Sequence, residues 1–271
     1  MKALTALSKS EIQEIAPAVF TNQPHPKVSD KYSFLPTHRV IDDMEKLGWS
    51  VSSVKMAKTN NLNQKKYGKH LVQFFNPELV IKDDQGEIEA YPQILIVNNH
   101  RGYGKLRIEV GVFRLVCENG LIIKDKEMGS YSLRHMGYSF EELQTLVNMV
   151  VGNLQGVVSK INQFTERIMT QEEQFSFAKK ALAVRFGEEK TASKEQIQDM
   201  LLVRRPEDKG DDLYKVFNRV QEAVIRGGFN VQSDTKSGAK KVRKISNMLK
   251  DLDVNGQLWV LAEEVLEPAM A

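Results

Sequence analysis

Cysteine is nearly absent from the sequence, which holds Cys117 alone among 271 residues. A single cysteine excludes an internal disulfide, and one cysteine with five scattered histidines does not form a zinc-binding pattern. Cys117 ends an apolar segment, a position more typical of a small buried side chain than of a nucleophile. We therefore expect neither a disulfide framework nor a bound metal.

Long apolar runs are missing as well. No window approaches the roughly 18 consecutive apolar residues that a membrane span requires. The first residues reach Glu11 and Glu14 before any long apolar core or cleavage site, so a secretory signal is not indicated. These absences predict a cytoplasmic protein without membrane contact.

Motifs of the common enzyme classes are also absent. The chain has no GxxxxGKS/T, HExxH or GxSxG sequence, and Gly102-Tyr103-Gly104 lacks the third glycine and the following helix of a dinucleotide site. Paired acids occur at the starts of expected helices, where the helix dipole favours them without any chemistry. We therefore expect no cofactor and no catalytic residue, although the sequence leaves enzymatic activity open.

The net charge of +3 is small, but the basic residues are unevenly placed. Two segments without any acid, 55–69 and 236–250, contain five and six basic residues. Basic residues beside an aromatic ring suit a single nucleic-acid strand, because they contact phosphates while the ring stacks on a base. A solvated lysine-rich surface is the alternative for either segment. The candidate nucleic-acid-binding residues are Lys58, Lys65, Lys66, Tyr67, Lys69, Arg101, Lys240, Lys241, Arg243 and Lys244.

The first half of the chain predicts an antiparallel sheet. Two apolar segments, 94–97 and 106–116, flank a polar, glycine-containing turn, which is the pattern of a hairpin. Alternating segments at 49–56 and 70–76 add further strands, and the short turns between them indicate a meander of five or six strands.

The second half predicts helices. Serine or threonine capping signals indicate helices that begin near residues 139, 170 and 193, and an apolar stripe continues the first of them to about residue 161. A fourth helix is expected over about 211–226, where Gly227 and Gly228 stop it. A last helix is expected near 254–265. The fold class is therefore α+β, an antiparallel sheet from the N-terminal half with several helices from the C-terminal half packed on one face.

Prolines interrupt the first part of the chain, where no long helix can form. The predicted organisation is an N-terminal arm over 1–36, followed by a single α+β domain over 37–271 that is sheet-rich at 49–138 and helical at 139–271.

Polar residues at unusual positions are further site candidates. Arg114 falls on the apolar face of its strand, so it needs a carboxylate or carbonyl partner, or it points into a site. Three clusters accompany it: Asn98, His100 and Arg101 in a turn; Arg134 and His135 before the first long helix; and Asn218, Arg219, Gln221, Glu222 and Arg226 on one helix. Each cluster is either a functional site or an internal hydrogen-bond network, and for Arg219 with Glu222, three residues apart on one helix face, we favour the internal network.

Four blocks occur in an order that resembles one protein family. They read NNHRGYGKLRIEVGVFRLVCENGLII, SLRHMGYSFEELQTLV, LYKVFNRVQEAVIRGG and LWVLAEEV. Together they resemble the family called domain of unknown function 932, found on plasmids, prophages and phages. The residues that match its motifs are Asn98, His100, Gly102, Arg114, Cys117, Asn119, Gly120, Arg134, His135, Asn218, Arg219, Gln221, Glu222, Arg226, Gly227 and Gly228. The resemblance implies a cytoplasmic protein of mobile DNA that deals with nucleic acid or with host defence.

Three functions remain as hypotheses. The first is a non-enzymatic protein that binds single-stranded DNA for annealing, recombination or replication of a mobile element. The second is an enzyme in which Arg114 and Arg134 form an anion pocket and His135 acts as general acid or base. The third is an interaction protein that binds a host or phage protein through its N-terminal arm and C-terminal helix. Exposed sheet edges would also allow a homo-oligomer.

Overall fold

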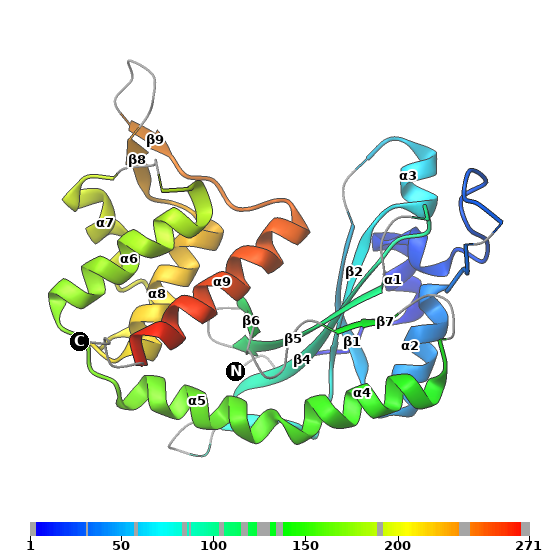
Figure 1. Ribbon diagram of the computed structural model, residues 1–271, viewed down its shortest axis with the longest axis horizontal. Helices are drawn as coiled ribbons and strands as arrows, with labels where there is room; N and C mark the ends of the chain where they lie inside the picture. Colours follow the sequence, from blue (N-terminus) through cyan, green and yellow to red (C-terminus); the bar gives the residue numbers. More distant parts are fainter. Residues whose placement is uncertain are drawn as a thin grey trace. The chain divides into compact units, whose positions relative to one another are not determined.

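The computed structural model describes residues 4–30, 32–56, 59–82, 86, 88–102, 106–114, 119–123, 131–133, 138–188, 192–232 and 239–266. The chain divides into two compact units, Met1–Leu154 and Gln155–Ala271 (Figure 1). Among the described residues, no helix is long and apolar enough to span a membrane.

Unit 1 is built on an antiparallel sheet. Its strands are β1 (Ser50–Met56), β2 (His70–Phe75), β3 (Ile81–Lys82), β4 (Ile88–Asn98), β5 (Leu106–Arg114), β6 (Asn119–Ile123) and β7 (Tyr131–Leu133). They lie in the order β1-β2-β4-β5-β6, with β3 paired to β4 and β7 paired to β5. The predicted antiparallel sheet is confirmed, and it is wider by one or two short strands.

The β4 and β5 hairpin is the centre of this sheet. Apolar residues face each other across it, as in the pairs of Ile94 with Val110 and of Ile96 with Ile108. Gly102 in the connecting turn has φ +80°, a conformation that favours glycine. The apolar alternation seen in the sequence therefore sets the register of the central strands.

The first residues of the chain belong to unit 1 as well. They form α1 (Lys9–Ile15) and η1 (Pro17–Phe20), and α2 (Thr37–Lys46) follows. Ile12 and Val19 are buried, and the Leu7 amide donates to the Val51 carbonyl of β1 at 2.8 Å. Where the sequence predicted an arm over 1–36, the structure places apolar residues of that segment in the core of the sheet unit.

The helix predicted from residue 139 to about 161 consists of two helices. α4 (Phe140–Gly152) ends at Asn153, and α5 (Leu154–Glu166) starts immediately after it. The boundary between the two units lies at this break. An apolar stripe alone could not locate it, because Asn153 interrupts the helix without interrupting the stripe.

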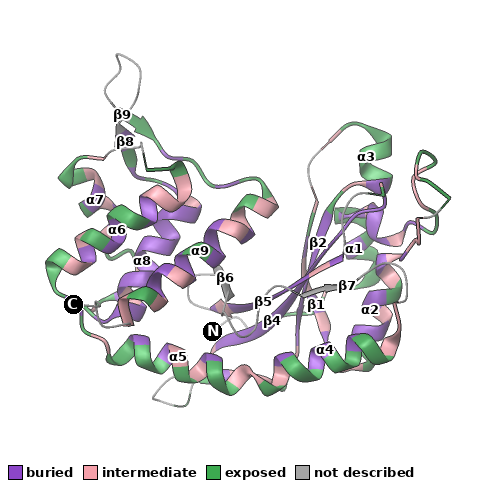
Figure 2. Cartoon of the chain, viewed as in Figure 1, coloured by how far each residue is buried: buried purple, intermediate pink, exposed green. Residues whose placement is uncertain are grey.

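Unit 2 contains most of the remaining helices. They are α6 (Gln171–Phe186), α7 (Lys194–Leu201), η2 (Pro206–Asp208), α8 (Leu213–Arg226) and α9 (Met248–Leu266), with the short strands β8 (Asn230–Gln232) and β9 (Ala239–Lys241). Full capping boxes start α6 and α7, as predicted. α8 is buried along most of its length (Figure 2), and Phe217 from it packs with Phe164 and Trp259.

Candidate nucleic-acid interface

The segment after β9 is fixed to the C-terminal end of α8 by backbone hydrogen bonds. Gly228 donates to the Val242 carbonyl at 3.0 Å, and Val242 donates to the Phe229 carbonyl at 2.8 Å. Three residues later, the Ile245 amide donates to the Ile225 carbonyl at 2.9 Å. The backbone between these points therefore has a defined position on unit 2.

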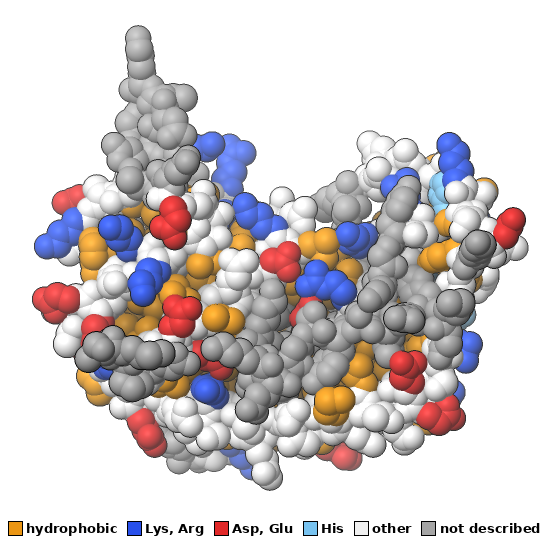
Figure 3. All heavy atoms as spheres, in the orientation of Figure 1, with side chains coloured by type: hydrophobic (Ala, Val, Ile, Leu, Met, Phe, Trp, Pro, Cys, Tyr) orange, Lys and Arg blue, Asp and Glu red, His pale blue; other side chains and the backbone are white. Residues whose placement is uncertain are grey.

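The predicted basic residues of unit 2 are all exposed: Lys240 and Lys241 lie in β9, and Arg243 and Lys244 lie in the fixed segment that follows it. We call Lys240, Lys241, Arg243 and Lys244 the basic strip. Val242 and Ile245, each of which follows a pair of these residues, are buried, so they anchor the segment while the charged side chains are exposed to solvent. Figure 3 shows basic side chains gathered beside the β8 and β9 hairpin.

Arg185 at the end of α6 adds a side-chain anchor. Its guanidinium donates to the carbonyls of Val224 on α8 and of Arg243 in the basic strip. Burial lowers the pKa of Arg185 from its ordinary value, but an arginine keeps its charge throughout the physiological range. The strip is thus held by α6 as well as by α8.

The first glycine after α8, Gly227, lies at a position where a side chain does not fit. Its φ is +76°, and a Cβ atom there would lie 2.4 Å from the Val242 carbonyl oxygen. We expect Gly227→Ala to lower the free energy of unfolding of unit 2 by about 2 kcal/mol, because strain and a clash with backbone act together. Urea denaturation followed by Trp259 fluorescence measures the loss.

Gly228 is the matched control for that substitution. Its φ is +94°, yet a Cβ there would meet nothing within 4 Å. Gly228→Ala therefore carries the backbone strain without the clash and should cost less than Gly227→Ala. Equal losses for the two variants would contradict the role assigned to the close approach at Val242.

The polar motif residues of α8 make internal contacts. Arg219 donates to the carbonyls of Asp208 at 3.2 Å and Gly210 at 2.9 Å, and to Gln174 of α6 at 3.2 Å. Gln221 donates to Asn255 of α9 at 2.7 Å. These contacts tie α8 to its neighbours, as expected for a network that holds helices together.

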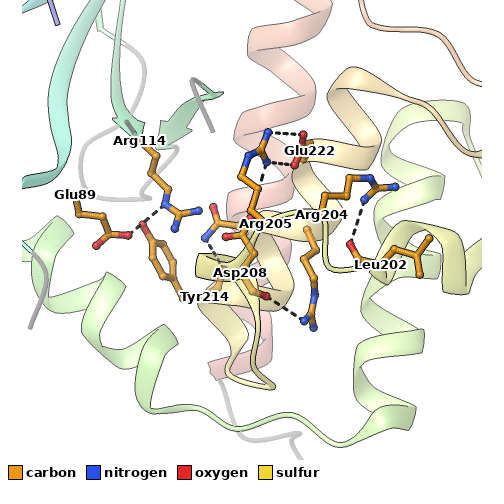
Figure 4. A network of polar contacts seen from close by, with 10 residues as sticks. Glu89, Arg114, Leu202, Arg204, Arg205, Asp208, Tyr214 and Glu222 are labelled. Atoms are coloured by element: carbon orange, nitrogen blue, oxygen red, sulfur yellow. Dashed lines mark hydrogen bonds and ion pairs between the residues drawn. The ribbon is translucent and has the colours of Figure 1, made fainter. Parts of the chain in front are cut away.

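Glu222 also belongs to an internal network, as we favoured for these two residues, but its partner is not Arg219. Its carboxylate accepts two hydrogen bonds from Arg205, one of them at 2.8 Å, and Asp208 lies 4.0 Å from the same guanidinium (Figure 4). Although Arg219 lies three residues before Glu222 on α8, it donates to the carbonyls of Asp208 and Gly210. The partner of Glu222, Arg205, is 17 positions away in the sequence, so no local pattern could predict this contact.

The predicted loop over residues 57–69 contains a short helix, α3 (Leu62–Tyr67). Lys65, Lys66 and Lys69 are exposed, whereas Tyr67 is buried and packs edge-on against His25 at 5.1 Å between ring centroids. The lysines are therefore available to phosphates. The tyrosine ring that we expected to stack on a base is used inside unit 1.

The turn residues Asn98 and His100 join a buried hydrogen-bond cluster. Asn98 donates to the Thr37 hydroxyl at 3.0 Å, and the Thr37 oxygen lies 2.7 Å from His70 Nε2 and 3.4 Å from His100 Nε2. His70 Nδ1 donates to the Gly68 carbonyl at 2.9 Å. Thr37, His70 and His100 are at most 1% exposed, so this hydroxyl and imidazole pair has no access to a substrate.

Thr37 and His70 were not selected as site residues from the sequence. They lie about 30 and 60 residues from their partners along the chain, and neither belongs to a short motif. The antiparallel pairing of β2 with β4 places His70 beside Asn98, and Thr37 contacts both from the start of α2. A correct strand register would have found His70, whereas Thr37 depends on how α2 packs on the sheet.

Arg114 has the carboxylate partner that its position on an apolar face demanded. Its Nε donates to Glu89 at 3.2 Å, and its side chain is 5% exposed (Figure 4). Asn119 is its register partner on β6. The other proposed pocket residues, Arg134 and His135, lie outside the described residues, as do Cys117 and Lys58.

Metal binding has no support among the residues that the structure describes. They contain no group of three or more histidine, cysteine, aspartate or glutamate side chains that could hold an ion. Arg226 of the α8 motif is half-buried at the end of its helix, and Arg101 is half-buried in the turn after His100.

Comparison with known proteins agrees with the resemblance in the sequence. The chain is 26% identical to the UPF0380 proteins YfjQ and YafZ of Escherichia coli (strain K12), each over 260 residues, which is 96% of this chain and 92% of the relative. No solved structure gives a significant match. The family model described as domain of unknown function (DUF932) matches residues 24–253, and the chain therefore belongs to that family.

Proposed function

We propose that this protein binds single-stranded nucleic acid, DNA above all, through the basic strip of unit 2. The observation that carries the proposal is the exposure of Lys240, Lys241, Arg243 and Lys244 on a backbone fixed by Val242 and Ile245. Because the backbone that carries these cations is already ordered, binding of phosphates costs no backbone entropy, and the affinity is greater than that of the same cations on a mobile segment.

The charge around the strip supports the same proposal. No acidic residue occurs from Ala239 to Lys250, so the phosphates of a bound strand meet no like charge from this segment. Contacts to phosphates supply affinity without sequence preference. Following the family resemblance, we place this activity in the cytoplasm and in the annealing, recombination or replication of a mobile element.

Neutralising the strip tests the proposal. The variant Lys240→Ala, Lys241→Ala, Arg243→Ala and Lys244→Ala is expected to bind an oligothymidylate strand at least about tenfold more weakly. Its plot of log affinity against log salt should lose about three units of slope, since each single-strand phosphate contact contributes about 0.7. Fluorescence polarisation of the labelled strand across a salt series measures both quantities.

Lys209→Ala is the matched control. Lys209 is an exposed lysine of unit 2, but it precedes the N-terminal end of α8, whereas the strip is attached to the C-terminal end. It should leave affinity and salt slope unchanged. The proposal fails if the wild-type protein does not bind the strand at low salt, or if the strip variant binds as the wild type does.

A further inference from the structure

Three segments far apart in the sequence meet at one end of unit 1. They are residues 25–28, 65–69 and 98–102. The His25 amide donates to the His100 carbonyl at 2.8 Å, and the His100 amide donates to the Tyr67 carbonyl at 3.1 Å. The His25 ring packs on Tyr67, so all three segments share one hydrogen-bonded framework.

This framework presents a set of basic side chains. Lys27, Lys65, Lys66 and Lys69 are exposed and Arg101 is half-exposed, and the three segments contain no aspartate or glutamate. Basic side chains and a histidine gather over α3 in Figure 3. The sequence could not show this surface, because Lys27 belongs to the segment that we expected to be an arm.

An apolar side chain lies within the same surface. Leu62 is 78% exposed, and it precedes Lys65 and Lys66 by three and four residues on α3, so the three side chains share one helix face. A duplex hides the faces of its bases, whereas a single strand offers them to apolar contacts. Leu62 beside two lysines therefore fits an unpaired base next to its phosphates.

We propose that Lys27, Lys65, Lys66, Lys69, Arg101 and Leu62 form a second binding site for single-stranded nucleic acid, separate from the basic strip. The inference rests on the proposed function, since it assigns the same class of ligand to unit 1. A chain with one site on each unit holds two strand segments at once, which is the arrangement that a strand-pairing protein requires.

The test uses the full chain with the basic strip already neutralised. In that background, oligothymidylate binding measured by polarisation at low salt is expected to fall at least about tenfold when Lys65, Lys66 and Lys69 become alanine. Lys82→Ala is the matched control, since Lys82 is exposed and pairs with Ile88 at the opposite end of β4 from Asn98. It should leave the remaining binding unchanged.

The outcomes separate this inference from the proposed function. Remaining binding that is the same with and without the three lysines overturns the second site and leaves the basic strip intact. A strip variant that binds like the wild type, but loses binding with the three lysines, overturns the strip and supports the second site. A wild-type protein that binds no strand overturns both.

Leu62→Ser gives an independent readout in the same background. It removes no charge, so duplex binding should stay constant while the preference for the single strand falls about threefold or more. An unchanged preference would contradict the contact between Leu62 and bases. Trp49 fluorescence verifies that unit 1 remains folded, because Trp49 is buried in that unit.

Discussion

Replacing Arg205 with methionine is expected to lower the free energy of unfolding of unit 2 by about 3 kcal/mol. Arg205 donates two hydrogen bonds to Glu222 and lies 4.0 Å from Asp208, whose side chains are 10% and 2% exposed. Methionine keeps most of the apolar stem but removes the positive charge. Two carboxylates then remain buried near each other without this cation, which is the costly half of a broken pair.

Trp259 provides the measurement, because it is the one tryptophan of unit 2 and Trp49 is the one tryptophan of unit 1. In a Trp49→Phe background, urea denaturation followed by fluorescence reports the unfolding of unit 2 alone. Arg204→Met is the matched control, since Arg204 is exposed and, among the contacts described, donates only to the backbone carbonyls of Asp199 in α7 and of Leu202 just after it (Figure 4). It should change the unfolding free energy by less than about 1 kcal/mol.

A double variant separates the charge from the packing. Adding Glu222→Gln to Arg205→Met removes the charge of one of the two carboxylates that have lost their cation, so part of the lost stability should return. If Arg205→Met costs no more than Arg204→Met, or if Glu222→Gln deepens the loss, the pair does not have the role assigned here.

Local patterns predicted the elements of this fold well. The alternation of apolar residues from 106 to 112 and the glycine turn before it defined the central hairpin, and the threonine and serine caps at Thr170 and Ser193 located two helix starts. These signals lie within a few residues of the structure that they specify, so they can be read without knowledge of the rest of the chain.

Contacts between distant residues could not be predicted in the same way. Arg114 needed a partner because a guanidinium on an apolar face cannot stay unpaired, yet nothing in the sequence pointed to Glu89. The partners of the α8 motif could not be predicted either. Arg219 contacts Asp208 in η2 and Gln174 in α6, and Glu222 contacts Arg205 just before η2. Sequence alone shows that such residues need partners, and only the fold supplies the partners.

Of the two proposed binding surfaces, one could be predicted from the local sequence and the other could not. The exposure of the basic strip agrees with the sequence, because the charged side chains favour solvent whereas Val242 and Ile245, the two apolar residues among them, are buried. The surface of unit 1 depends instead on His25, Tyr67 and His100 meeting across three segments. Tyr67 illustrates the difference. Its position among lysines in the sequence predicted base stacking, but in the fold its ring is buried against His25.

The free energy of unfolding of unit 1 should fall in acid because of His70, which is buried beside Thr37 and Asn98. Burial lowers the pKa of His70 from its ordinary 6.5 to about 4, and His70 is fully buried. Its Nδ1 donates to Gly68, so its Nε2 accepts the proton of the Thr37 hydroxyl. A protonated Nε2 would have to donate to the Thr37 oxygen, which already accepts a hydrogen bond from the Asn98 amide.

The sign of the effect follows from proton uptake. Between pH 6.5 and pH 4 the unfolded chain binds a proton at His70 and the folded chain does not, so stability falls as the pH falls. The loss is complete near pH 4 and amounts to about 3 kcal/mol, at about 1.4 kcal/mol for each pH unit. Above pH 6.5 both states hold the neutral imidazole, and this contribution to stability is fully present.

His70→Gln removes the titrating group and is the variant that isolates the effect. It is expected to be less stable than the wild type at pH 7.5, because glutamine cannot reproduce both hydrogen bonds, but its stability should depend less on pH between 6.5 and 5. Urea denaturation followed by Trp49 fluorescence, in a Trp259→Phe background, measures unit 1 at each pH. Parallel pH profiles for the two proteins would show that the acid sensitivity of unit 1 arises from groups other than His70.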